Sequence, residues 1–140
     1  KAFGGLVPAK EKREILGILF PSSVFSGRAP EGGAILSVFM GGINNPSIFE
    51  RDDKYIESMV LAEISSTLHC SRKPDMFNIF RYRHAIPQYE ISTGERLRAI
   101  AGIQEEYPGL FLAGNIRDGI GMSDRVKQAR QLADSLTGTI

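Results

Sequence analysis

Residues 110–133 read LFLAGNIRDGIGMSDRVKQARQLA, and this stretch decides how the end of the chain folds. The apolar run Leu110–Ala113 predicts a short strand, and the glycines after it predict a tight turn. A helix is predicted from Asp124 to about Leu136, with a buried stripe formed by Val126, Ala129, Ala133 and Leu136. A strand, a turn and a helix start in this order bring backbone N–H groups and a helix dipole together, which suits an anion.

The spacing of the glycines does not identify a ligand by itself. Gly114 and Gly119 are too far apart for the dinucleotide-binding fingerprint, and the chain has no Gly-Lys-Ser/Thr of a phosphate-binding P-loop. Asp118 and Asp124 argue against a direct phosphate cradle, although Asp124 can instead cap the helix. From the pattern alone, an anion site and a plain strand-to-helix connection both remain open.

Composition excludes several classes of function. The 140 residues contain 17 basic and 16 acidic side chains, and this near balance predicts no nucleic-acid partner. A single cysteine, Cys70, rules out a disulfide within the chain, and with only His69 and His84 beside it no zinc-ligand spacing exists. The longest apolar runs fall far short of the roughly 20 residues that cross a bilayer.

The first half of the sequence predicts antiparallel strands with a helix packed against them. Apolar runs at Ile15–Phe20 and Ala34–Met40 are joined by a loop rich in proline and glycine, which indicates a strand pair. A helix is predicted over about Lys54–Leu68, capped by Asp52 or Asp53. Its apolar side chains recur at helical spacing and form the predicted core stripe: Ile56, Met59, Val60, Ile64 and Leu68.

The second half predicts a different organisation. Met76–Ile86 alternates aromatic and basic side chains and is interpreted as a half-buried strand. Thr93 is expected to cap a helix that runs to about Glu106, with Leu97, Ile100, Ala101 and Gln104 facing inward. The predicted fold class is therefore α+β: antiparallel strands with a packed helix, then a C-terminal helix–strand–helix. We place a domain boundary between residues 1–89 and 90–140.

Four segments resemble one family in the same order and with similar spacing. They are LVPAKEKREILGILFPSSVF, SVFMGG, HAIPQYEI and the stretch quoted first. Together they resemble the C-terminal portion of the oxygen-dependent protoporphyrinogen and coproporphyrinogen III oxidases, flavoenzymes of the flavin amine oxidase superfamily. The resemblance implies that the chain, which begins within apolar sequence, is the last part of a longer protein.

The resemblance also implies which residues meet the cofactor FAD. Gly114 and Asn115 would lie near its pyrophosphate and ribityl chain. Gly119, Ile120, Gly121 and Met122 would lie at the helix start beside the flavin ring, and Met122 would contact the ring through its backbone. Arg125 stands where family members often have a small residue, and no flavin contact is assigned to it.

Phe39, two residues before Gly41–Gly42, would lie on a strand that lines the porphyrinogen cavity; an ordinary core position is the alternative. Ile86, Pro87 and Tyr89 match a family turn that routes the chain between domains. No side chain is identified as catalytic: His84 is the only nearby acid or base, and we assign it a structural role. No metal ligand is predicted.

The implied reaction is a six-electron oxidation of protoporphyrinogen IX or coproporphyrinogen III to the porphyrin, with O2 as acceptor and hydrogen peroxide as product. The alternatives are a piece of another flavin amine oxidoreductase, such as an amine oxidase or carotenoid desaturase, or a free-standing interaction domain. The expected location is the cytoplasm, with peripheral association of the parent protein with the cytoplasmic membrane left open. The isolated chain is expected to be inactive, and its dimerisation is left open.

Overall fold

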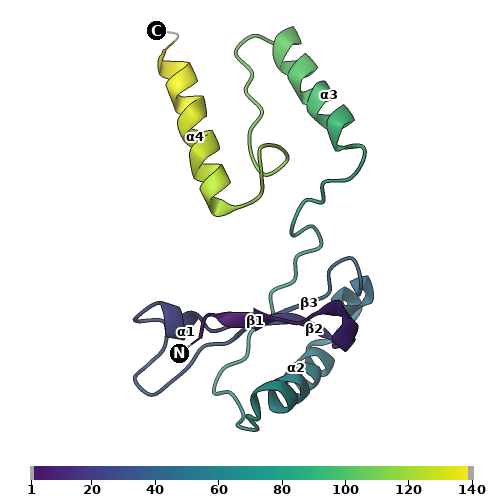
Figure 1. Ribbon diagram of the computed structural model, residues 1–140, viewed down its shortest axis with the longest axis vertical. Coiled ribbons are helices and arrows are strands. Elements are labelled where there is room, and N and C mark those ends of the chain that lie inside the picture. The colour runs from purple at the N-terminus through teal and green to yellow at the C-terminus, as the bar shows by residue number, and fades with distance from the viewer. Residues whose placement is uncertain (1, 139–140) are drawn as a thin grey trace. The chain divides into compact units, whose positions relative to one another are not determined.

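The computed structural model describes residues 2–138, which divide into two compact units between Arg81 and Tyr82. Each unit is described by itself. The first contains strands β1 (Gly4–Leu6), β2 (Ile15–Leu19) and β3 (Ser37–Met40), helices α1 (Pro21–Val24) and α2 (Asp53–Leu68), and two single-turn 3-10 helices at Ala9–Glu11 and Pro46–Glu50. The second contains α3 (Thr93–Glu106) and α4 (Met122–Thr137) (Figure 1). The predicted α+β class is confirmed.

The three strands form an antiparallel sheet in the order β1-β2-β3. The predicted strand pair is therefore present, and Gly4–Leu6 adds a third strand at its edge. Between Ile15 and Gly17 the register of β2 against β3 shifts by one residue, so that Leu16 is an extra residue in β2. Such a bulge reverses the alternation of side chains, which lets both Ile15 and Ile18 point to the same face.

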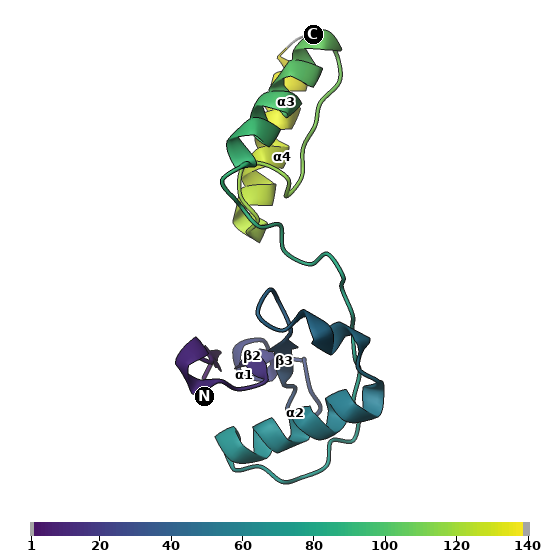
Figure 2. The same cartoon turned by 90° about the vertical axis from the view of Figure 1, so that its right-hand side faces the viewer.

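The core of the first unit lies between this face of the sheet and α2. Ile15 and Ile18 of β2 and Ile56 and Val60 of α2 are all buried, and α2 lies along one side of the sheet (Figure 2). Burial of such a side chain contributes about 1.5–3 kcal/mol relative to exposure. Of the predicted α2 stripe, Met59 and Ile64 are half-buried, whereas Leu68 at the end of the helix is exposed.

Helix α2 is fixed at both ends by local chemistry. The carboxylate of Asp52 accepts the N–H of Tyr55 at 2.7 Å, which confirms the predicted aspartate cap. The helix ends at His69, whose φ of 53° is in the left-handed region. Arg13 donates to Glu63 at 2.9 Å and to Ser66 at 2.7 Å, tying the β1–β2 connection to the helix surface.

The prediction of a strand at Met76–Ile86 is wrong. The segment forms no ladder, and Met76, Phe80 and Tyr82 are each about 70–75% exposed. Alternation of aromatic and basic side chains permits a strand only where a neighbouring strand supplies hydrogen bonds. Arg81 instead anchors the segment by donating to the carbonyl of Arg51 at 2.8 Å and pairing with Asp53 at 2.7 Å.

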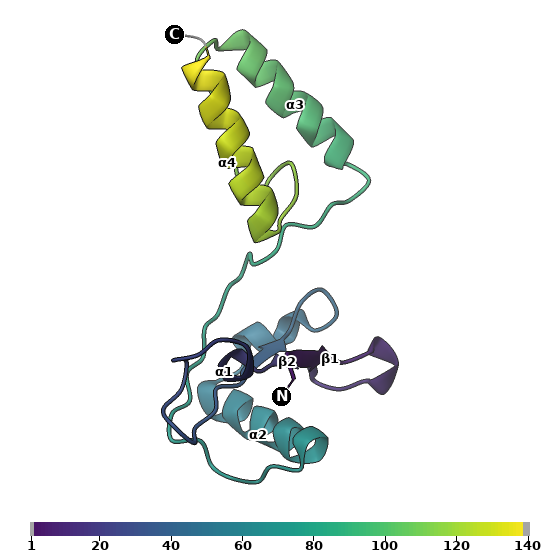
Figure 3. The ribbon, with the colours of Figure 1, turned by 60° about the vertical axis from the view of Figure 1, so that its left-hand side comes forward.

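In the second unit the residues between the helices form no strand. Leu110–Ala113 was predicted as one, but it has no ladder partner within residues 82–138. Its main chain is held by a side chain instead, because Leu112 N–H donates to Gln104 Oε1 at 2.8 Å. The segment runs back along the helices, so that α3 and α4 point in the same direction (Figures 1 and 3).

Both helices of the second unit bury less than predicted. On α3, Ile100 is buried and Gln104 half-buried, but Leu97 and Ala101 are exposed. Thr93 is the first helical residue rather than the cap, and Ser92 at the cap position makes no side-chain capping bond.

On α4 the predicted apolar stripe is exposed, with Val126 at 67% and Leu136 at 45%. The helix turns Gln128 and Leu132 inward, a face about 100° away around the axis.

Candidate functional site

The turn between Leu110–Ala113 and α4 holds all six residues for which the family resemblance implies contact with FAD: Gly114, Asn115, Gly119, Ile120, Gly121 and Met122. We call residues 114–122 the glycine turn. Its backbone is left-handed at Gly114 (φ 117°), Asp118 (φ 61°) and Gly119 (φ 96°). A conformation of this kind suits glycine and, to a lesser extent, aspartate.

Three backbone N–H groups of the glycine turn have side-chain acceptors, and a fourth, that of Arg117, donates to the carbonyl of Gly114 at 3.3 Å. Gly114 N–H donates to Gln128 Oε1 at 2.8 Å, and Gly119 N–H donates to the Tyr89 hydroxyl at 3.2 Å. Gly121 N–H donates to Asp124 Oδ2 at 3.0 Å, so Asp124 caps α4 from its first turn. These three donors hold the turn together and do not face a ligand.

Free backbone donors remain at the start of α4. The first N–H groups of a helix have no intrahelical acceptor, and the first such bond of α4 runs from Arg125 N–H to the carbonyl of Gly121 at 3.1 Å. The N–H groups of Met122 and Ser123 therefore precede the hydrogen-bonded part of the helix. Beside them, the side chain of Met122 is 85% exposed and that of Ile120 is 44% exposed. The helix start thus combines polar backbone with uncovered apolar surface.

Glycine is required for different reasons at Gly119 and Gly114. A Cβ on Gly119 would overlap the Asp124 side chain, whereas a Cβ on Gly114 would meet no atom within 4 Å. Gly119 is therefore demanded by packing inside the turn. Gly114 is demanded only by its backbone angle, and the space beside it is open to a ligand.

Charges around the glycine turn nearly cancel. Asp118 receives a hydrogen bond from Gln128 Nε2 at 2.7 Å and one from Arg117 Nε at 2.8 Å. The Gln128 hydrogen bond, reinforced by the charge of Arg117, lowers the pKa of the Asp118 carboxyl below its usual value, and partial desolvation opposes this. The carboxylates of Asp118 and Asp124 balance the guanidinium groups of Arg117 and Arg125, so the side chains of the turn carry little net charge of either sign.

The lowered pKa of Asp118 gives a pH dependence of defined sign. Because the folded-state pKa lies below that of the unfolded chain, the ionised carboxylate stabilises the fold at pH values above about 4. This contribution is lost as the pH falls through the folded-state pKa. Asp118→Asn should therefore lower the free energy of unfolding at neutral pH, and the difference from wild type should vanish in acid.

Urea unfolding at a series of pH values measures this difference. The matched control is the same substitution in a Gln128→Leu background, where the strongest partner of Asp118 is gone. The pH-dependent difference should be smaller there. A difference of equal size in both backgrounds, or one that grows in acid, would contradict the assignment.

Sequence reasoning missed three residues that shape the turn: Arg125, Gln128 and Tyr89. Arg125 Nη2 donates to the carbonyls of Arg117, Asp118 and Gly119 at 2.8–2.9 Å. Gln128 is the buried polar residue of α4. A glutamine on the buried face of α4 would have indicated a polar contact with the turn. The apolar stripe at Val126, however, predicted that a different face of α4 is buried.

Phe39 lies in the first unit, on the face of the sheet opposite α2. It pairs with Gly17, which pairs in turn with Leu6 on β1, so these residues share one face. Phe39 is 49% exposed and Leu6 is 83% exposed. Gly17 lies between them, and the Leu6 side chain reaches over it, so that a Cβ on Gly17 would lie 3.0 Å from Leu6 Cδ2. The alternative prediction, that Phe39 is an ordinary core residue, is therefore wrong. Its contact with a substrate stays a prediction.

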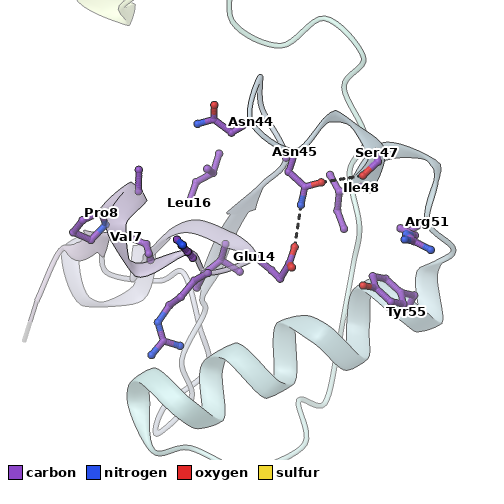
Figure 4. Close-up of a pocket in the computed structure, with 15 residues that line it drawn as sticks. Val7, Pro8, Glu14, Leu16, Asn44, Asn45, Ser47, Ile48, Arg51 and Tyr55 are labelled. Carbon is purple, nitrogen blue, oxygen red and sulfur yellow. Dashed lines mark hydrogen bonds between the residues drawn. The ribbon is translucent and has the colours of Figure 1, made fainter.

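A cleft of about 720 Å³ in the first unit was not predicted from the sequence. It lies between the β1–β2 connection and the segment after β3, and Figure 4 shows Asn45 bridging Glu14 and Ser47 at one side. Arg51 lies over the Tyr55 ring at 4.8 Å. The residues that line the cleft include basic, acidic and amide side chains, and we assign no ligand to the cleft.

Other kinds of site find no support in the part of the chain that the structure describes. No three His, Cys, Asp or Glu side chains within residues 2–138 gather as a metal site would require. None of the helices described has the length and apolarity to cross a bilayer. The candidate cofactor site is the glycine turn, and the candidate apolar surface is the sheet face at Leu6 and Phe39.

Comparison with known proteins agrees with the resemblance inferred from the motifs. Residues 1–136 match the family described as flavin containing amine oxidoreductase. The chain is 28% identical to protoporphyrinogen oxidase 2 of Arabidopsis thaliana, over 96% of the chain and 27% of that protein. It is 27% identical to coproporphyrinogen III oxidase of Bacillus subtilis (strain 168), over 78% of the chain and 24% of that protein.

A solved structure shows the same fold. The crystal structure of a candidate protoporphyrinogen oxidase from Exiguobacterium sp. 255-15 superposes with a TM-score of 0.79 at 24% identity. The match covers 96% of this chain and 30% of that one. The chain thus spans about a quarter of the length of the curated relatives quoted above. The match to the family over nearly all residues shows that this chain belongs to the flavin containing amine oxidoreductases.

Proposed function

We propose that the chain contributes part of an FAD-dependent porphyrinogen oxidase that converts protoporphyrinogen IX or coproporphyrinogen III to the porphyrin. The observation that carries the proposal is the match, over almost the whole chain, to proteins named as these two oxidases in plants and bacteria. The chain's family membership supports a flavin cofactor. The proposal assigns residues 1–89 to the substrate domain and 90–140 to the FAD domain.

The glycine turn fits the ring portion of a flavin better than a phosphate. Uncovered N–H groups at the start of α4 suit a carbonyl edge, and exposed Ile120 and Met122 suit a flat ring. Gly114 and Asn115 would admit the ribityl and pyrophosphate parts, because the space beside Gly114 is open. A bound flavin would accept hydride equivalents and pass them to O2.

The chain's own residues bind and orient under this proposal. The face of the sheet at Leu6, Gly17 and Phe39 would contact the apolar body of the tetrapyrrole. The first N–H groups of α4 would fix the position of the ring. We assign no proton transfer to any side chain of the chain, and His84 keeps a structural role.

Two proteins test the proposal: the 140-residue chain and the product of the longest reading frame that contains it. The second should carry stoichiometric flavin and produce porphyrin fluorescence from a porphyrinogen while consuming O2. The chain alone should bind little FAD, because it spans about a quarter of its relatives. Oxidation of amines or carotenoids without porphyrin formation would overturn the proposal, and stoichiometric flavin on the chain alone would overturn its partial role.

The proposal also places the parent protein in the cytoplasm, with peripheral attachment to the cytoplasmic membrane as an accompanying proposal. Fractionation of cells that express the protein tests both. Recovery in the soluble fraction at all salt concentrations would contradict membrane attachment. Equilibrium sedimentation of the chain tests its dimerisation.

A further inference from the structure

Arg125 and Gln128 form the centre of a polar network beneath the glycine turn. Gln128 is 9% exposed, and both ends of its amide are used. Its Oε1 accepts from Gly114 N–H at 2.8 Å and from Arg125 Nη1 at 2.5 Å, while its Nε2 donates to Asp118 at 2.7 Å. One side chain therefore connects the beginning of the turn to its middle.

The guanidinium of Arg125 connects the middle of the turn to α4. Its Nη2 lies 2.8 Å from the carbonyl of Arg117, 2.9 Å from that of Asp118 and 2.8 Å from that of Gly119. Three consecutive carbonyl oxygens that converge repel one another, and the positive charge of the guanidinium between them offsets this repulsion. The left-handed backbone of Asp118 and Gly119 is what allows the carbonyls to converge.

This network determines which backbone atoms the turn shows to the outside. Three carbonyls are thereby turned inward and Gly114 N–H is bound to Gln128, so these backbone atoms are not available to a ligand, whereas the first N–H groups of α4 have no intrahelical acceptor. Two other side chains hold the second half of the turn: Tyr89 accepts from Gly119 N–H, and Asp124 accepts from Gly121 N–H. The network consists of residues from one element and the turn before it, so it belongs wholly to the second unit.

We infer that Arg125 and Gln128 are positioning residues that hold the glycine turn in the shape to which the flavin binds. The inference rests on the proposed function, since it takes the turn to be a wall of the flavin site. Neither residue contacts the flavin under this inference; each acts through the backbone of residues 114–119.

The first test measures the turn itself in the 140-residue chain by hydrogen exchange. Arg125→Met and Gln128→Leu should accelerate exchange of the Gly114, Gly119 and Gly121 amides by about tenfold or more, as expected for the loss of one or two hydrogen bonds. Arg130→Met and Gln131→Leu are the matched controls, because they make the same changes on the exposed surface of α4. The controls should leave these amides unchanged.

Conservative variants separate hydrogen-bond geometry from charge. Arg125→Lys keeps the charge but cannot reach all three carbonyls, so the turn should exchange at a rate between wild type and Arg125→Met. Gln128→Glu keeps an acceptor but loses the donor to Asp118. If Arg125→Met does not fold, the exchange rates of the turn amides in Arg125→Lys and Gln128→Glu test the inference instead. Exchange at the turn equal to wild type in both would overturn the inference.

The second test measures the flavin in the product of the longest reading frame. At equal flavin loading, Arg125→Lys should shift the visible absorbance bands and the midpoint potential of the bound flavin and raise its dissociation constant. Arg130→Lys should not. A loosened turn with unchanged flavin properties would overturn the link to the cofactor. A wild-type protein without flavin would instead overturn the proposed function, and the exchange result would stand separately.

Discussion

Replacement of Gly119 by alanine is expected to disrupt the glycine turn. The residue has a φ of 96°, which costs a non-glycine residue about 1–3 kcal/mol. The added Cβ would also come within 2.9 Å of Asp124 Cβ and closer still to its carboxylate, so the Asp124 side chain must move. That movement breaks the cap on Gly121 and costs about a further 1 kcal/mol. Urea unfolding of the chain followed by circular dichroism measures the sum.

Two other glycines provide matched controls for this substitution. Gly114→Ala has a strained φ of 117° but open space, so it should lose only the backbone contribution. Gly102 lies inside α3 with nothing within 4 Å, and Gly102→Ala should stabilise the chain by about 0.5–1 kcal/mol. A Gly119→Ala protein no less stable than Gly114→Ala would show that Asp124 does not fill the space beside Gly119.

Replacement of Ile15 by alanine should have the largest effect in the first unit. The side chain is 1% exposed and packs in a core of four apolar residues. Removing it leaves a cavity that few neighbours can fill, and we expect a loss of about 2–5 kcal/mol. Whole domains are stable by about 5–15 kcal/mol, so this change removes a large part of the stability of so small a core.

Hydrogen exchange at residues 15–18 and 56–60 reports the Ile15→Ala effect locally. Leu6→Ala is the control in the same sheet, because Leu6 is 83% exposed, and it should change the free energy of unfolding by less than about 0.5 kcal/mol. Ile15→Val should fall between them, at about 0.5–1.5 kcal/mol. Equal protection in Ile15→Ala and Leu6→Ala would contradict the assigned core.

Elements that local chemistry specifies were predictable from the sequence. Helix α2 follows from its repeated apolar spacing and its Asp52 cap, and both are properties of neighbouring residues. Strands at Leu110–Ala113 and Met76–Ile86 were predicted and are absent, because a strand requires a partner that these units do not supply. The prediction that the apolar stripe of α4 is buried was wrong for a related reason. Periodicity shows that one face of a helix is apolar, but it does not show that another element covers that face.

The glycine turn was predictable in location but not in construction, and its role as a cofactor site, which rests on the family resemblance, stays a prediction. Clustered glycines marked the turn, since few other residues adopt its left-handed backbone. The side chains that hold it come from positions whose roles depend on the folded path. Arg125 reaches back six to eight residues to carbonyls that converge only after the turn has formed. No spacing rule in the sequence encodes such a contact.

The bulge at Leu16 has a consequence for the family's evolution. Because β2 carries one residue more than β3 at this point, deletion of Leu16 would restore strict alternation and turn either Ile15 or Ile18 away from α2. Changes of residue type at Leu16 are tolerable, whereas a change of length is not. We therefore expect single-residue gaps among related sequences to avoid β2 and to accumulate in the loop at residues 25–36.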